Sequence, residues 1–186
     1  GQYTHSKKAY AMRLFLFALI SELPYCLAFT QDGIIEFEGL NMMFTLLICF
    51  GILVVFERTS DKGLRFTYAL FSIILSLFCS WAILAPIFTL LFIWSKGSDK
   101  KIKLSFIIAV LLFAAFNLAG GIGRFSVTTN ILYALGSMVG TGLSGIVVVY
   151  LYNEKRMEKG RVFSKWFFYC FYPVHLLILG LIRIFM

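Results

Sequence analysis

The chain has 186 residues, of which 60% are hydrophobic, 18% aromatic and only 14% charged. Soluble domains average about 45–50% apolar and about 25% charged residues, so a soluble enzyme, a disordered protein and a disulfide-stapled secreted domain are excluded. The remaining class is a polytopic membrane protein, and this length allows about seven crossings at most. The net charge of +8 then reflects the lysine and arginine bias of cytoplasmic loops, with no nucleic acid partner.

Apolar segments alternate with short polar loops along the whole chain. We therefore predict an all-α polytopic transmembrane helix bundle, a single integral membrane domain over residues 1–186. The uncharged stretch 66–94 is too long for one span and short for two, so we expect it to turn near residues 79–81. The predicted spans, in chain order, are roughly 10–30, 40–56, 64–79, 81–95, 102–119, 131–152 and 164–185.

The distribution of basic residues supports this division. With a turn in the stretch 66–94, every lysine and arginine except Arg124 and Arg183 falls on the side of the N-terminus. With a single span there, the basic residues would divide almost equally between the two sides. The positive-inside rule therefore favours about seven spans, with the N-terminus cytoplasmic and the C-terminus outside.

Two ionisable side chains lie deep within predicted spans, where a charge costs about 3 kcal/mol or more. Glu22 lies about 18 Å and His175 about 14 Å from the cytoplasmic face, at 1.5 Å per residue. Pairing would make the carboxylate the orienter of a histidine general base. The alternative is a structural hydrogen bond, from Glu22 to the histidine or to a tyrosine. Pro24 and Pro173 stand beside the two groups and predict either cavity-lining breaks or ordinary kinks.

Other polar residues lie near the predicted cytoplasmic face. Arg13 and Asn153 stand near cytoplasmic ends of spans, where they suit either a phosphate group or lipid headgroups. His5 lies in the basic N-terminal stretch, where solvation is the default interpretation. In the sixth span, Gly136 and Gly140 are spaced for close helix contact, either inside the bundle or in a homodimer.

No metal site or nucleophilic serine is predicted, because the sequence has neither HExxH nor Gly-x-Ser-x-Gly. The cysteines form no CxxC and are interpreted as small buried apolar residues. They are Cys26, Cys49, Cys79 and Cys170.

Two segments resemble the TraX family of bacterial membrane proteins. One is THSKKAYAMRLFLFALISELPYCLAF at 4–29, and the other is YLYNEKR at 150–156 followed by SKWFFYCFYPVHLLILGLI at 164–182. The first member of that family is linked to conjugation, as an acetylase of pilin N-termini. More distantly, the family resembles the integral membrane acyltransferases, which use cytoplasmic acetyl-CoA. The resemblance implies a location in the bacterial cytoplasmic (inner) membrane, and no metal cofactor.

The resemblance also implies roles for individual residues. His175 and Glu22 would transfer protons, and Arg13 would bind a CoA phosphate or form a structural pair. Family members begin with additional apolar sequence that carries an Asp-His pair, and this chain starts after that point. The implied alternatives are a fragment, a part supplied by another chain, or a protein that is not an active transferase. The matching positions with binding roles are Arg13, His5, Tyr172 and Asn153.

The leading hypothesis is a multi-pass acyltransferase that moves an acetyl group from acetyl-CoA to a hydroxyl or amine. The acceptor would be a pilin-like peptide N-terminus or an envelope glycan. A buried Glu–His pair also suits a proton-coupled transporter, although the two halves show no internal repeat. The third hypothesis is a non-catalytic membrane assembly subunit, favoured by the glycines of the sixth span.

Overall fold

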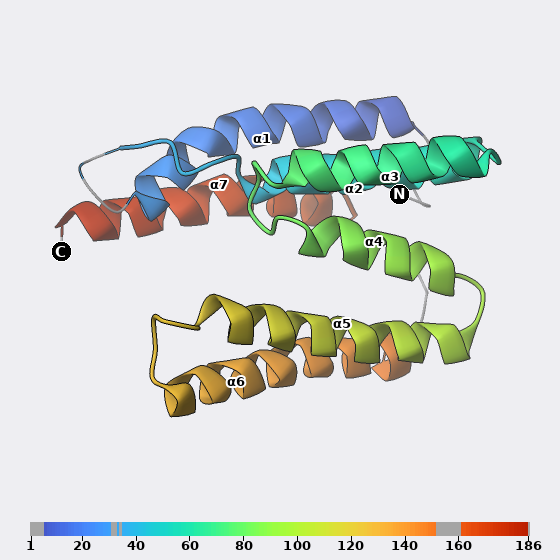
Figure 1. Cartoon of the computed structure of the whole chain (residues 1–186). Helices are drawn as coiled ribbons and strands as arrows, with labels where there is room; N and C mark the ends of the chain where they lie inside the picture. Colours follow the sequence, from blue (N-terminus) through green and yellow to red (C-terminus); the bar gives the residue numbers. More distant parts are fainter. Residues whose placement is uncertain (1–5, 31–32, 34, 152–160, 186) are drawn as a thin grey trace. The chain divides into compact units, whose positions relative to one another are not determined.

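A computed structural model describes residues 6–30, 33, 35–151 and 161–185, without the side chains of residues 161, 162, 164 and 165. Within these ranges the chain forms seven α-helices and one π turn, and no strand beyond an isolated bridge between Leu40 and Cys79. Figure 1 shows the elements in chain order. They are α1 (Lys7–Phe29), α2 (Met42–Arg58), α3 (Lys62–Ser76), α4 (Leu84–Ser95), α5 (Asp99–Gly120), α6 (Val127–Ile146), η1 (Val147–Leu151) and α7 (Arg161–Phe185).

The all-α prediction is confirmed, and each predicted span has a helix at its place. Helix formation also stops within the stretch 66–94, between the end of α3 and the start of α4. Among the described residues, four helical segments are long and apolar enough to cross a membrane: α1, α5, α6 with η1, and Trp166–Phe185 of α7. Helices α2 to α4 have 17, 15 and 12 residues, and at about 18–26 Å they are shorter than a bilayer core. The count of seven spans and the orientation remain predictions.

The chain divides into two compact units, which we describe separately. The first comprises Gly1–Thr89 and Arg156–Met186, and the second Leu90–Lys155. In both units many large apolar side chains point outward, among them Phe15, Leu23 and Leu132. Such a surface is unsuited to water and suits the hydrocarbon of a bilayer.

In the first unit, α1 packs against α2 and α7. Its core is formed by buried side chains of these three helices: Leu14, Ala18, Met43, Phe50 and Tyr169. Gly180 of α7 lies directly against Leu27 of α1, with a Leu27 methyl carbon 2.8 Å from where a Cβ would be. The absence of a side chain there lets α1 and α7 approach closely.

Arg183 joins the C-terminal ends of α1 and α7. Its Nε donates to the carbonyl of Leu27 at 3.0 Å, and its Nη1 donates to the carbonyl of Thr30 at 2.7 Å. The carbonyls at a helix end have no partner within the helix, so this guanidinium caps α1. The two helices therefore run in the same direction.

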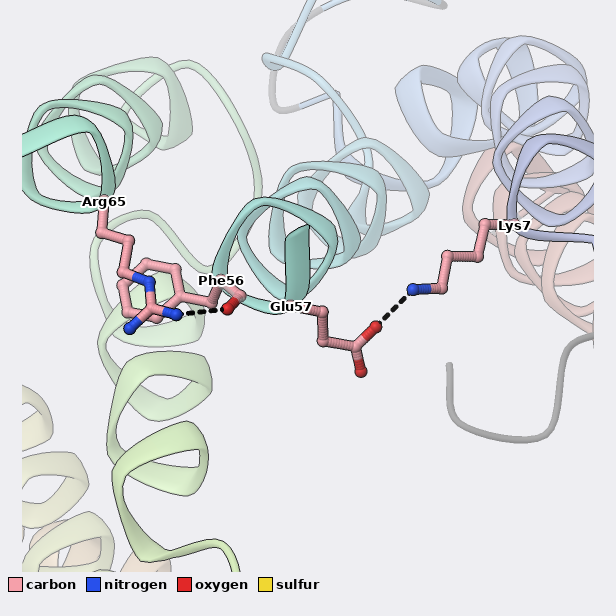
Figure 2. Close-up of polar contacts among 4 residues, drawn as sticks. All are labelled: Lys7, Phe56, Glu57 and Arg65. Atoms are coloured by element: carbon pink, nitrogen blue, oxygen red, sulfur yellow. Dashed lines mark hydrogen bonds and ion pairs between the residues drawn. The ribbon is translucent and has the colours of Figure 1, made fainter. Parts of the chain in front are cut away.

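A second polar corner lies at the opposite end of α1 (Figure 2). Lys7 forms an ion pair with Glu57, which makes α2 antiparallel to α1. Arg65 of α3 donates from Nη2 to the carbonyl of Phe56 at 2.8 Å and lies over its ring, with Cζ 5.3 Å from the centroid. Arg65 Nε also donates to the carbonyl of Thr59 at 2.6 Å. This corner caps α2 and sets the positions of α1, α2 and α3 at one end.

The second unit contains the hairpin of α5 and α6. Asn130 donates from Nδ2 to the carbonyl of Leu118 at 2.8 Å across the turn. Gly145 packs against Phe106 of α5, whereas an added Cβ at Gly136 or Gly140 would meet nothing within 4 Å. The close glycine contacts of this hairpin are therefore at Gly145 and at Gly121, which lies against Asn130, whereas the predicted Gly136–Gly140 pair is open.

The cysteine prediction is correct at three positions and wrong at one. Cys26, Cys49 and Cys79 are buried, but Cys170 is exposed. The buried face of α7 passes through Tyr169 and Leu176, and Cys170 points away from it.

We predict that Arg183→Ala lowers the free energy of unfolding by about 2 kcal/mol, because it leaves two carbonyls of α1 without their charged donor. The measurement is thermal unfolding of the purified protein in detergent. Arg183→Lys should recover only part of the loss, since one ammonium does not reproduce the fork of the guanidinium. Arg124→Ala, at an exposed arginine of the α5–α6 turn, is the control. Equal melting temperatures for the two alanine variants would contradict the prediction.

Candidate functional site

The first unit contains four of the predicted site residues: Arg13, Glu22, Tyr172 and His175. His5 and Asn153, the other two, lie outside the described residues. Helices α1 and α7 continue through Pro24 and Pro173, so neither proline ends its helix.

Asn41, which the sequence analysis did not single out, binds the carboxyl group of Glu22. Its Nδ2 donates to Glu22 Oε2 at 2.6 Å and to the carbonyl of Ala18 at 2.7 Å. Its backbone N–H also donates to Glu22 Oε2, at 3.3 Å, while its Oδ1 accepts from the N–H of Met43 at 2.9 Å and caps α2. Asn41 is fully buried, so it holds Glu22 against the start of α2.

The second oxygen of Glu22 is buried and has no hydrogen-bond partner among the described residues. Glu22 also lines a hollow of about 360 Å³, together with Cys26, Glu36 and Phe37. Leaving a buried carboxyl oxygen unpaired costs free energy. This oxygen can therefore make one further hydrogen bond to a ligand. It accepts that bond when the carboxyl group is ionised and donates it when the oxygen carries a proton.

His175 is oriented by its own helix. Its Nδ1 lies 3.1 Å from the carbonyl oxygen of Tyr172, and its ring stacks on Phe171 with centroids 5.3 Å apart. A carbonyl oxygen only accepts hydrogen bonds, so Nδ1 carries the proton in the neutral ring and Nε2 keeps its lone pair. His175 thus presents a basic nitrogen whose tautomer is set by the backbone.

The hydrogen bond considered between Glu22 and His175 does not form among the described residues. Glu22 bonds Asn41, and the hydrogen bond and ring contacts that His175 makes among the described residues lie within α7. Two side chains at similar depth in different helices meet only if both point toward the contact between those helices, and depth alone does not determine that. The buried side chain that precedes α2 lies closer to the carboxyl group.

Tyr172 connects this cluster to a second hollow. Its hydroxyl oxygen accepts the N–H of Met42 at 3.2 Å, and its own proton has no acceptor among the described residues. The hollow measures about 450 Å³ and runs between α1, α2 and α7. Apolar and aromatic side chains line it, including Leu14, Leu46 and Phe168. His175 is one turn beyond Phe171 and Tyr172, which line its wall.

Arg13 lies three residues after Tyr10 on α1, and Tyr10 lines this hollow. Arg13 makes no ion pair within the described part of the chain. Its Nε is buried without a hydrogen-bond partner there. The structural pair considered for Arg13 is therefore not formed in these ranges.

The segment between α3 and α4 also reaches the cluster. Ser80 pairs with Leu40 through its backbone N–H at 2.8 Å, donates from Oγ to the Tyr25 hydroxyl at 2.8 Å, and accepts at its carbonyl from Thr45 Oγ1 at 2.5 Å. Trp81 and Ile83 follow with φ of 60° and 66°, in the left-handed region that side chains rarely adopt. Such strain persists only where the surroundings impose it, and it is common at functional sites.

Tyr25, Asn41, Thr45 and Ser80 were missed because their significance depends on contacts distant in sequence. Only Asn41 carried a local signal, since an asparagine just before an apolar run is typical of a helix N-cap. A capping role alone would not have indicated a bond to Glu22.

The family comparison extends over nearly the whole chain. A family model described as "TraX protein" matches residues 1–183. No curated protein and no solved structure gives a significant match. The matched range includes Arg13, Glu22, Asn41, Tyr172 and His175.

We predict that Asn41→Asp destabilises the protein by about 3 kcal/mol, because it removes two donors and places a second carboxyl group against Glu22. Thermal unfolding in detergent measures the effect. In the double variant with Glu22→Gln, the amide at position 22 donates to the carboxyl group at position 41, which reverses the wild-type bond. The double variant should therefore be more stable than Asn41→Asp alone. Asn117→Asp is the control, because Asn117 bonds only the carbonyl of Phe113 in its own helix. Equal losses at both asparagines would refute the proposed bond.

Proposed function

This chain belongs to the TraX family, and from that premise we propose that it is a multi-pass membrane acyltransferase. In this proposal it moves an acetyl group from acetyl-CoA to an amine or hydroxyl acceptor at the bacterial inner membrane. Its N-terminus is cytoplasmic, and the acceptor is a pilin-like peptide N-terminus, as in conjugation, or an envelope glycan. The observation that carries the proposal is the bond from His175 Nδ1 to the carbonyl of Tyr172, one turn beyond the hollow that Phe171 and Tyr172 line. It leaves Nε2 without a hydrogen bond among the described residues.

His175 acts as the general base. Its Nε2 takes the proton from the acceptor nitrogen or oxygen as that atom forms a bond to the thioester carbonyl carbon. The carbon–sulfur bond then breaks, and the same nitrogen returns the proton to the departing thiolate. The bond from Nδ1 to the carbonyl of Tyr172 supports this role, because it keeps the lone pair on Nε2.

Tyr172 stabilises the negative charge that develops on the carbonyl oxygen. Its hydroxyl lines the same hollow and accepts from the N–H of Met42, which leaves its proton free to donate. A pre-oriented donor at such a position lowers the barrier for acyl transfer.

The residues present fit acetyl-CoA as the acyl donor. The hollow is apolar and suits a pantetheine arm, while Arg13 is a cation whose buried Nε has no hydrogen-bond partner within the described ranges. A guanidinium is well suited to phosphate. Arg13 would thus hold a phosphate at the N-terminal end of α1, which we predict to be cytoplasmic.

The acidic hollow favours an amine as the acceptor. Glu22 and Glu36 both line it, and Glu22 Oε1 has no partner among the described residues. Two carboxyl groups attract an ammonium group more strongly than a neutral hydroxyl. Hydrogen bonds through Asn41 and Met42 connect Glu22 to Tyr172.

A proton-coupled transporter is the second candidate. It is favoured by the same unpartnered oxygen of Glu22, because an intramembrane carboxyl group is typical of proton relays. A transporter moves solute across vesicle membranes without forming an acylated product. An assembly subunit does neither, and the open Gly136–Gly140 face would then suit contact with a second copy.

We predict that the protein in detergent releases CoA from acetyl-CoA when supplied with a peptide that has a free N-terminus. His175→Ala should slow release by about 10²–10⁴-fold as the base is lost, and Tyr172→Phe by about 10²–10³-fold as the donor is lost. Tyr133→Phe on α6 is the matched control, because its ring contact with Phe125 does not need the hydroxyl. Release that is unaffected by His175→Ala would refute the proposed role.

Glu22→Gln tests the preference for an amine. The variant keeps an oxygen for Asn41 but loses the charge, so KM for the peptide amine should rise about tenfold, equivalent to about 1.4 kcal/mol. KM for the same peptide with a hydroxyl in place of its amine should change little. Glu38→Gln is the control, because Glu38 is exposed on the same loop and does not line the hollow. Equal changes for both acceptors would contradict the proposed role of the carboxylate.

A further inference from the structure

The second unit contains a hollow of its own, formed by α5, α6 and η1. It measures about 430 Å³ and is open along one side. Its wall is apolar over most of its length, and Lys103 and Tyr150 are its polar lining residues. The apolar part includes Phe106, Val110, Met138, Gly142, Gly145 and Val149.

Two glycines create this space. At Gly142 an added Cβ would meet no atom within 4 Å. The hollow is therefore open at this turn of α6 because residue 142 has no side chain. At Gly145 the ring of Phe106 takes the place of a side chain, with Cδ1 2.9 Å from the Cβ position. The hairpin is thus closely packed on one side of Gly145 and open beside Gly142.

A cation stands at one end of the hollow. Lys103 Nζ lies 5.0 Å from the centroid of the Tyr150 ring. It makes no ion pair among the described residues, and Asp99, one turn earlier on α5, does not pair with it. Lys101 lies over Trp94 in the same way, at 5.1 Å. Lysines beside tryptophan and tyrosine at a helix end are typical of the membrane–water interface.

The π turn η1 forms the wall opposite Lys103. Val149 and Tyr150 both belong to it and both line the hollow. The wider π turn interrupts the regular spacing of α6, and such turns are frequent at functional sites. Here it presents an aromatic ring to the lysine where the apolar wall ends.

The ligand that fits is amphipathic and anionic. Both helices are candidate membrane spans, and the apolar part of the hollow suits a hydrocarbon chain. The ammonium of Lys103, which has no ion pair among the described residues, suits a phosphate near the membrane surface. The volume is also within the range of about 300–1,000 Å³ that small-molecule sites show.

We propose that this hollow binds an anionic phospholipid. One acyl chain lies between α5 and α6 against Gly142, and the phosphate binds Lys103 beside Tyr150. The proposal does not depend on acyl transfer, because none of these residues belongs to the candidate site of the first unit.

Native mass spectrometry of the purified full chain tests the proposal, with phosphatidylglycerol and phosphatidylcholine titrated separately. The wild type should retain phosphatidylglycerol in preference to phosphatidylcholine. Lys103→Gln should weaken phosphatidylglycerol binding about fivefold, the equivalent of about 1 kcal/mol for one lysine. Gly142→Leu should abolish the preference, because its side chain fills the empty turn without a clash.

Two matched variants distinguish this site from general lipid binding. Lys100→Gln removes a neighbouring lysine that does not line the hollow, and Gly136→Leu adds the same side chain at another open glycine of α6. Both should bind lipid as the wild type does. Three results would overturn the proposal. The protein could retain both lipids equally, it could retain neither, or each test variant could lose as much binding as its control. No retention is also the result expected if another part of the chain or a second copy covers the hollow.

Discussion

The hydrogen bonds from Asn41 to Glu22 are the interaction on which the first unit depends. A carboxyl group at membrane depth must find a donor within the protein, because hydrocarbon offers none. Asn41 supplies that donor while it caps α2 and bonds the carbonyl of Ala18 on α1. One buried amide therefore determines where α2 begins, how it meets α1, and which way the carboxyl group points.

The rest of the candidate site follows from this placement. Met42, the next residue, donates its N–H to Tyr172 and so brings α7 to the start of α2. Leu40, the preceding residue, pairs with Phe78 and Ser80 and holds the strained turn beside the cluster. Asn41 bonds only one oxygen of Glu22 among the described residues, and His175 bonds the carbonyl of Tyr172 in its own helix. This separation leaves the carboxyl group available for a second task, which we assign to the acceptor.

Charged residues at the helix ends fix the positions of α1, α2, α3 and α7 relative to one another. Arg183 holds the ends of α1 and α7 together, and the corner of Lys7, Glu57 and Arg65 holds α1, α2 and α3 at the other end of α1. In lipid, contact between apolar side chains adds little to helix association, since lipid tails are equally apolar. Polar contacts and close packing at small residues such as Gly180 therefore determine the pairing of these helices.

The amino-acid sequence by itself determined the all-helical fold, the apolar character of the helices, their positions and the family. These properties depend on hydropathy over 15–25 residues and on local motifs, which are read along one segment at a time. It also singled out Glu22 and His175, because ionisable groups are conspicuous in apolar segments, and Tyr172 through the family resemblance. Only the tertiary structure decided that Glu22 bonds Asn41, that Ser80 and Tyr25 join the cluster, and that Gly142 borders an open hollow. Those contacts depend on how each helix is rotated about its axis, and that rotation is set by its neighbours.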